Sequence, residues 1–277
     1  MGTTTPPLST ETPATKDAPP GSSCSCNCAI LRSSILLKAV MAVTGLILFG
    51  FTFVHMVGNL LIFLPPEAIN SYGYLLHHSG VHGLTLIWPF RVFLLASAVL
   101  HIVAAVILTK RNRAARPVAY AEIKPNGATL ASRTMFVGGL VLAVFIVFHI
   151  LHFTLEAGPF AATRGYEAPL PANSVATLNL LTVPESHDGS TEIKVVHDVH
   201  RMVVAGFQNV WVSLFYLVSL CFLGLHLKHG GAALLRSLGI GNRATFPWQN
   251  FIARAFALAI FVGMAAVPVA VLLGIVK

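Results

Sequence analysis

The sequence predicts an all-α membrane protein, a bundle of five transmembrane helices, from its composition, its apolar runs and its histidines. Hydrophobic residues make up 55% of the 277 residues and charged residues only 10%, whereas a soluble domain carries about 25% charged residues. Five apolar runs are long enough to cross the bilayer core as helices, which takes about 20 residues. Four of these runs hold a histidine towards their C-terminal end. An imidazole in lipid is costly unless something binds it, so these histidines are functional candidates.

Residues 1–30 differ from the rest of the chain and are predicted to be a disordered tail. They are rich in Thr, Pro, Ser and Ala, so they cannot bury enough apolar surface to fold alone. They lack the basic and apolar regions of a secretory signal. Cys24, Cys26 and Cys28 are separated by single residues, whereas structural zinc sites prefer gaps of about two to four. We expect free or lipidated thiols there, with a metal site as the second interpretation.

The remaining chain, residues 31–277, is expected to form one membrane domain without internal repeats. Its apolar runs lie at residues 36–64, 88–109, 134–155, 202–227 and 251–275. The fifth run holds no His, Asp, Glu or Lys after Arg254, which is typical of a helix that only packs.

Charged loop residues predict the orientation of the bundle, because Lys and Arg are enriched in cytoplasmic loops. Basic residues precede the first run, fill the loop after the second and follow the fourth: Arg32, Lys38, Lys110, Arg111, Arg113, Arg116, Lys124, Arg133, Lys228, Arg236 and Arg243. Acidic residues gather in the other loops: Glu67, Glu156, Glu167, Glu185, Asp188, Glu192 and Asp198. We expect a multi-pass protein of a cell membrane (inner or plasma), with its N-terminus in the cytoplasm and its C-terminus outside. This placement explains the net charge of +8 without nucleic acid as a partner.

The four histidines of the runs, His55, His101, His149 and His226, fall at two expected depths. His55 comes 17 residues after Lys38 and His149 comes 16 after Arg133, so both should lie towards the outer face. His101 comes 9 residues before Lys110 and His226 comes 10 before Arg236, so both should lie towards the cytoplasmic face. The expected depths therefore match in two pairs, His55 with His149 and His101 with His226.

Two facing imidazoles at one depth can bind the iron of a haem, which needs only two axial protein ligands. A bare zinc ion would want more nitrogen or sulfur ligands than either depth offers. Eleven residues return a helix to within about 20° of the same face, one level away. Counting eleven back from His55 and His149 gives Thr44 and Gly138, small residues where a second macrocycle would need room. A single histidine that bonds to a neighbouring helix is the simpler alternative, and His152 and His229 could replace their neighbours as ligands.

Four segments of the chain carry a resemblance to a known family: FVHMVGNL, FRVFLLASAVLHIV, SRTMFVGGLVLAVFIVFHILHFT and FQNVWVSLFYLVSLCFLGLHLKHG. They resemble the cytochrome b membrane-anchor subunit of succinate:quinone oxidoreductases, in the di-haem, single-subunit, five-helix type shared by succinate dehydrogenases and quinol:fumarate reductases. The resemblance covers roughly residues 31–277, and LHLKHG with Ser237-Leu238-Gly239 is its most specific part.

The resemblance implies a function in electron transport, as in respiratory complex II of the tricarboxylic acid cycle. It implies two stacked haem b sites, with His55 and His149 on the distal haem and His101 and His226 on the proximal one. It selects His226 over His229, and His149 over His152 less firmly. It also implies a flavoprotein subunit and an iron–sulfur subunit on the cytoplasmic face, which carry the dicarboxylate chemistry, and a quinone, with menaquinone favoured, in the membrane.

The sequence leaves the haem-propionate and quinone residues open. Arg91 and Arg133 could each pair with a propionate or anchor a helix at the membrane interface. Glu67 could exchange protons with quinone or be a solvated loop acid. Asp198, Arg201 and Gln208 are comparable candidates at the start of the fourth run.

Two other functions are compatible with a polytopic, histidine-bearing chain. One is the haem b subunit of another quinone-linked oxidoreductase, such as a formate dehydrogenase or hydrogenase, although those usually have four spans. The other is a proton-coupled transporter with a relay of buried histidines, although the inverted repeats and broken helices common in transporters are not evident.

Overall fold

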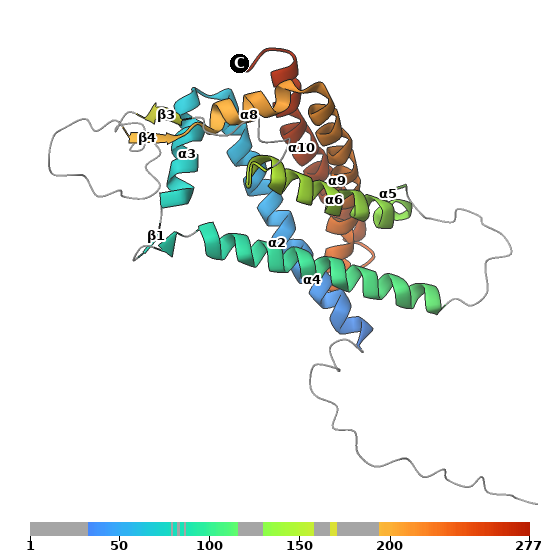
Figure 1. Ribbon diagram of the computed structural model, residues 1–277. Helices are drawn as coiled ribbons and strands as arrows, with labels where there is room; N and C mark the ends of the chain where they lie inside the picture. Colours follow the sequence, from blue (N-terminus) through green and yellow to red (C-terminus); the bar gives the residue numbers. More distant parts are fainter. Residues whose placement is uncertain are drawn as a thin grey trace, which may run out of the picture.

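A computed structural model describes residues 33–78, 80, 81, 84, 85, 87–115, 130–157, 167–170 and 194–277 (Figure 1). The predicted tail, with Cys24, Cys26 and Cys28, lies outside the described residues. The described chain is dominated by helices, and its strands form only two short antiparallel ladders.

Five helices are long and apolar enough to cross a membrane, as predicted. They are α2 (Ser34–Leu60), α4 (Ile87–Ala114), α6 (Met135–Phe153), α9 (Val210–Ser237) and α10 (Phe246–Leu272). A short 3-10 turn, η1 (Leu61–Phe63), extends α2. The fold class and the multi-pass membrane character are therefore confirmed.

The polar segments divide between two ends of the bundle (Figure 1). At one end α2 begins, α4 ends, α5 (Leu130–Arg133) packs on α9, and α9 turns back into α10. We call this the basic end, since Lys38, Lys110, Arg111, Arg113, Arg133, Arg236 and Arg243 belong to it. The Arg111 guanidinium donates to Ser34 Oγ there, at 3.2 Å, and ties the end of α4 to the start of α2.

The opposite end of the bundle, which we call the cap end, carries the C-terminus and the short elements that connect the spans on that side (Figure 1). These are α3 (Pro66–His78), α8 (Val199–Gln208), and the ladders β1 (Gly80–Val81) with β2 (Leu84–Thr85) and β3 (Glu167–Leu170) with β4 (Lys194–His197). Asn70 of α3 joins the two cap helices: its side-chain amide donates to Asp198 Oδ1 at 3.1 Å, and its Oδ1 accepts from the His200 backbone N–H at 2.9 Å.

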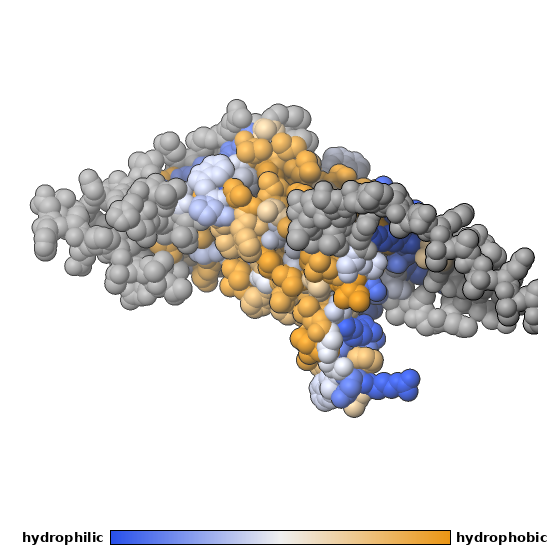
Figure 2. Space-filling model, turned by 90° about the horizontal axis from the view of Figure 1, so that it is seen from below, coloured by the Kyte–Doolittle hydropathy of each residue, from blue (hydrophilic) through white to orange (hydrophobic). Residues whose placement is uncertain are grey.

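The closely packed spans are α9 with α10, α2 with α4, α6 with α9, and α2 with both α9 and α10. Small residues allow the closest approach: a β-carbon on Gly231 of α9 would lie 3.3 Å from Ala253 Cβ of α10, as is common between membrane helices. The outward faces are apolar, with Val92, Leu140 and Leu258 all more than half exposed, and Figure 2 shows apolar side chains over the middle of the bundle. Such a surface suits lipid.

The fourth span begins and ends later than the predicted run at 202–227. Asn209, with ψ 112°, breaks the chain out of helical geometry, and its side chain accepts from the backbone N–H groups of Trp211 and Val212. It is thus the N-cap of α9, and the preceding residues form the separate helix α8, which contributes Met202, Val203 and Phe207 to the largest buried cluster.

The segment after the first span, expected to be an outer loop, is helical instead. Pro66 and Glu67 begin α3, in agreement with the preference for proline and acidic residues in a first helical turn. In the other cap helix, His200 is only 8% exposed because α8 packs on α10.

Candidate functional site

His55 of α2 and His149 of α6 face each other near the cap end. Their ring centroids lie 5.6 Å apart, with the ring planes at 81°. Phe51, one turn before His55, stacks on the His55 ring at 5.2 Å, and Phe145 lies 5.9 Å from the ring of His149. The structure therefore brings the first predicted pair together within an aromatic surrounding.

Tyr216 of α9 links His149 to His152. Its hydroxyl lies 3.1 Å from His149 Nδ1 and 3.0 Å from His152 Nδ1. The His152 side chain is only 3% exposed and packs against Phe153 and Gly206. Of His149 and His152, it is His149 whose ring contacts the ring of His55.

His101 of α4 and His226 of α9 form the second pair, near the basic end. Their ring centroids are 6.2 Å apart and their planes are at 65°. His101 Nδ1 lies 3.1 Å from the Met41 carbonyl oxygen and 3.2 Å from Thr44 Oγ1. A carbonyl can only accept, so Nδ1 carries the proton and the lone pair of His101 is on Nε2.

The residues eleven positions before His55 and His149 lie beside the second histidine pair, as the helix repeat predicts. Thr44, eleven residues before His55, contacts His101, a member of the other pair. Gly138, eleven residues before His149, lines the same narrow gap as His226, a gap with no room for a water molecule. Eleven residues of helix rise about 16 Å, so the two histidine pairs lie at two well-separated levels.

Neither histidine pair belongs to two helices that pack closely. His55 and His149 join α2 to α6, and His101 and His226 join α4 to α9, whereas the close contacts of α4 and α6 are with α2 and α9 respectively. The two imidazoles of each pair thus come from helices that do not pack closely on each other. Other spans hold those helices apart.

The pairs fit the ligand set of a haem. A metal–imidazole nitrogen bond of about 2 Å, with the nitrogen about 1 Å from the ring centre, puts two trans imidazole centroids roughly 6 Å apart. The observed 5.6 and 6.2 Å agree with this separation, although ordinary edge-to-face rings also fall in this range. The bond from His101 Nδ1 to a carbonyl is the kind of outer contact that orients metal-ligating histidines.

Two further observations describe the polar groups around the pairs. Among the described residues, no group of three or more His, Cys, Asp or Glu side chains could hold a metal ion. His226 Nδ1 is buried and has no hydrogen-bond partner in the described part of the chain, which leaves a polar atom of the basic-end pair unsatisfied.

The predicted arginines and Glu67 lie at the ends of the bundle. Arg91 is in the first turns of α4, with its guanidinium carbon 5.2 Å from the Trp88 ring centre. Arg133 is exposed at the end of α5. Glu67 is exposed in the first turn of α3. The structure does not bring any of the three into contact with a histidine pair through an observed hydrogen bond or ring contact.

Asp198 and Gln208, candidates from the start of the predicted fourth run, lie at the two ends of α8. Asp198 is the N-cap of α8: its carboxylate accepts from the Arg201 backbone N–H at 3.0 Å and from Asn70. Gln208 is exposed at the end of α8. These contacts account for Asp198 without a ligand.

Tyr216 is the site residue that sequence reasoning missed. Its only sequence signal is a phenol inside an apolar run, ten residues before His226. A buried tyrosine hydroxyl needs a hydrogen-bond partner, so this signal could have suggested a polar contact within the bundle, but not with which residue.

Comparison with known proteins does not identify the chain: no protein-family model, curated protein or solved structure matches it.

Proposed function

We propose that the chain is the di-haem cytochrome b membrane-anchor subunit of a succinate:quinone oxidoreductase. In this role it relays electrons between an iron–sulfur subunit and membrane quinone and anchors the soluble subunits. The observation that carries the proposal is the arrangement of four intramembrane histidines as two facing pairs at two levels of one bundle. Histidines that only pack in the core would have no reason to face each other. Two facing pairs at two levels are therefore better explained by a shared ligand at each level.

Each part of the bundle would contribute to holding the cofactors. Bound haem supplies one-electron redox chemistry. The imidazoles of His55 and His149, and of His101 and His226, would be the axial ligands. Met41 and Tyr216 would orient their rings, and the phenylalanines around the cap-end pair would exclude water. Burial and outer contacts of this kind tune haem potentials.

The ends of the bundle supply candidates for the other ligands. Arg133 belongs to the basic end, nearer to His101 and His226, and Arg91 to the cap end, nearer to His55 and His149, so each could pair with the propionates of a different haem. Glu67, exposed at the cap end, is the candidate for proton exchange with quinone, for which menaquinone is the favoured type.

The segregation of charge supports the proposed orientation. All described acidic residues, Glu67, Glu156, Glu167 and Asp198, belong to the cap-end segments. The basic end, and with it the N-terminus, would face the cytoplasm, where the flavoprotein and iron–sulfur subunits would dock. The cap end and the C-terminus would face the outside of the cell membrane.

The test is purification from native membranes with its partners, followed by haem quantitation, a reduced-minus-oxidised visible spectrum and a succinate-to-quinone assay. We expect two b haems per chain and succinate-dependent quinone reduction. Two haems without succinate activity would favour another quinone-linked oxidoreductase. A chain without haem would contradict the proposal and favour the transporter.

Single-histidine variants assign the ligands. His149→Ala should lower the haem content from two per chain to one, and His101→Ala should do the same by removing the other haem. His152→Ala is the matched control, because its ring does not complete either pair, and it should keep both haems. Loss of a haem in His152→Ala with both retained in His149→Ala would show that the ligand was assigned to the wrong histidine.

A further inference from the structure

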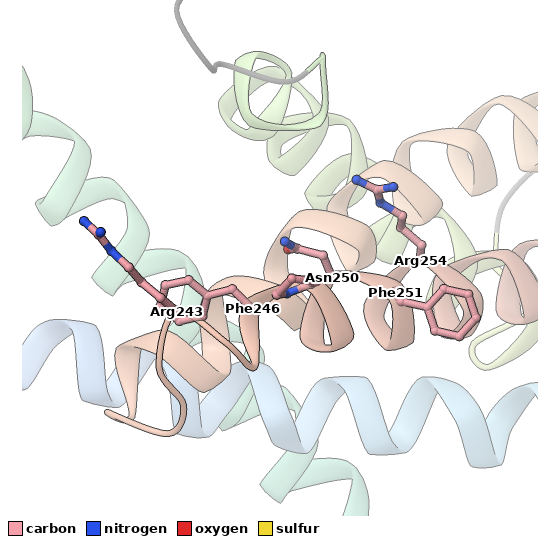
Figure 3. A pocket seen from close by; sticks show the side chains of 6 residues that line it. Arg243, Phe246, Asn250, Phe251 and Arg254 are labelled. Carbon is pink, nitrogen blue, oxygen red and sulfur yellow. The ribbon is translucent and has the colours of Figure 1, made fainter.

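The start of α10 forms a cationic hollow that the proposed function does not use. It has a volume of about 440 Å³ and is lined by Arg243, Phe246, Pro247, Asn250, Phe251 and Arg254. Figure 3 shows these side chains in a row along the helix, from Arg243 at one end to Arg254 near the other, with Asn250 between them. The residues from Phe246 onward follow the spacing of three and four that places side chains on one helix face.

The charge of this hollow is not neutralised within the described part of the chain. Neither Arg243 nor Arg254 has an ion-pair or hydrogen-bond partner there, and both are exposed. A third guanidinium, that of Arg236 in the last turns of α9, lies 5.7 Å from the Phe246 ring centre. The described acidic residues are all at the cap end. The hollow thus presents guanidinium groups to an anion, and a phosphate can bind such groups through two parallel hydrogen bonds.

The position of Arg254 places the hollow at the border of the membrane. Arg254 comes eight residues after Phe246, about 12 Å further along the helix, on a face that the other spans leave exposed. Figure 3 shows its side chain leaning back along the helix towards Asn250. Arginines near a helix end extend in this way to reach the headgroup layer.

An apolar stripe continues from the hollow into the membrane. Leu258 is seven residues after Phe251 and Val262 eleven after it, so all three share one face. They are 61%, 62% and 56% exposed. The opposite face of α10 is buried, with Ala253, Ala257 and Ile260 at most 5% exposed. A headgroup-sized cationic hollow thus leads onto a strip that matches an acyl chain, an arrangement that a soluble anion or an acidic protein surface would not need.

We propose that this hollow binds the headgroup of an anionic phospholipid, with an acyl chain along Phe251, Leu258 and Val262. Basic pockets of membrane helices on the cytoplasmic side commonly bind anionic headgroups. The proposal does not depend on haem or on the partner subunits.

Trp248 provides the measurement, because it is 69% exposed beside the hollow and its ring contacts that of Phe251. The other two tryptophans, Trp88 and Trp211, begin α4 and α9 at the cap end. In a full-length Trp88→Phe/Trp211→Phe background, reconstituted in phosphatidylcholine vesicles, acyl-brominated phosphatidylglycerol or phosphatidylcholine is titrated and quenching of Trp248 is recorded. We expect phosphatidylglycerol to quench at a lower mole fraction than phosphatidylcholine.

Arg243→Gln/Arg254→Gln should reduce this preference roughly fivefold for each guanidinium removed. The matched control is Lys38→Gln/Arg113→Gln, which removes two exposed positive charges from the same end outside the hollow and should keep the preference. Equal quenching by the two lipids, or an equal loss in the control pair, would overturn the proposal.

Two further arms separate lipid from other causes. Inorganic phosphate should not displace brominated phosphatidylglycerol, and displacement would show a general phosphate site rather than a lipid site. Arg243→Lys/Arg254→Lys keeps both charges and should keep most of the preference. If this pair loses the preference with an unchanged far-UV circular dichroism spectrum, the electrostatic assignment is wrong.

Discussion

At the scale of single residues, Tyr216 determines which nitrogen of each neighbouring imidazole is free. A hydroxyl has one hydrogen, so Tyr216 donates to one of His149 Nδ1 and His152 Nδ1 and accepts from the other. A metal-ligating histidine normally donates its second ring N–H to an acceptor. With His149 as the ligand, its Nδ1–H donates to Tyr216, whose hydroxyl then donates to His152. Tyr216 is thus a positioning residue that acts through His149.

Tyr216→Phe tests this role under the proposed function. The variant should keep two haems, since all four ligands remain. Loss of the acceptor for Nδ1–H makes His149 a weaker donor to iron, so the midpoint potential of one haem should rise and that of the other should stay. The measurement is a potentiometric titration of the visible spectrum, with electron paramagnetic resonance of the oxidised protein.

Ser219→Ala provides the control for Tyr216→Phe. Ser219 lies on the same helix, one turn further on, is 1% exposed and donates within the helix to the Phe215 carbonyl oxygen. The control should leave both potentials unchanged. Equal shifts of both haems in Tyr216→Phe, or a shift in Ser219→Ala, would indicate a general packing effect instead of an effect through His149.

At the scale of helices, Gly45 allows α2 to approach the imidazole of α4. A β-carbon at Gly45 would lie 3.2 Å from His101 Cε1, tighter than most such contacts. A larger side chain there must therefore push the His101 ring away from His226. Gly45 thus makes room for the His101 ring where α2 packs on α4.

Under the proposed function, Gly45→Leu should remove the haem that His101 and His226 would hold and lower the haem content from two per chain to one. Gly50→Leu is the matched control on the same helix, because a β-carbon at Gly50 meets nothing within 4 Å. Both variants add the same side chain to α2, so haem quantitation separates the local clash from any general effect on the helix. Two haems retained in Gly45→Leu would mean that His101 does not depend on this approach.

At the scale of the whole molecule, most of the bundle follows from short-range features of the sequence. The spans were predictable because lipid requires long apolar helices. The contact of Thr44 with His101 and the position of Gly138 beside His226 agree with a count of eleven residues along a regular helix. The heights of the four histidines follow from their spacing to charged loop residues, which needs no knowledge of helix packing.

Features that depend on contacts between distant segments were not predictable. Tyr216 meets His149 from 67 residues away, and no local pattern records that pairing. Asn209 was assigned to the interior of a span because an apolar run does not show where a polar residue turns inward to cap a new helix. His200 is buried only because α8 packs on α10. Each of these misses lies at the cap end, where short elements replace the regular spans.

The separation of charge between the two ends makes a prediction for the whole bundle in its membrane. Transferring the basic end across the bilayer would cost about 2.5–3.5 kcal/mol for each Lys or Arg at the bilayer centre, so one orientation should dominate. In a background with all four cysteines replaced by serine, Ala114→Cys places a thiol at the basic end and Lys277→Cys one at the cap end, both at exposed positions. A membrane-impermeant maleimide should label Lys277→Cys in right-side-out vesicles and Ala114→Cys only in inverted ones, with detergent exposing both. The reverse pattern would put His101 and His226 on the side away from the cytoplasm, and the proposed docking of soluble partners at the basic end would be wrong.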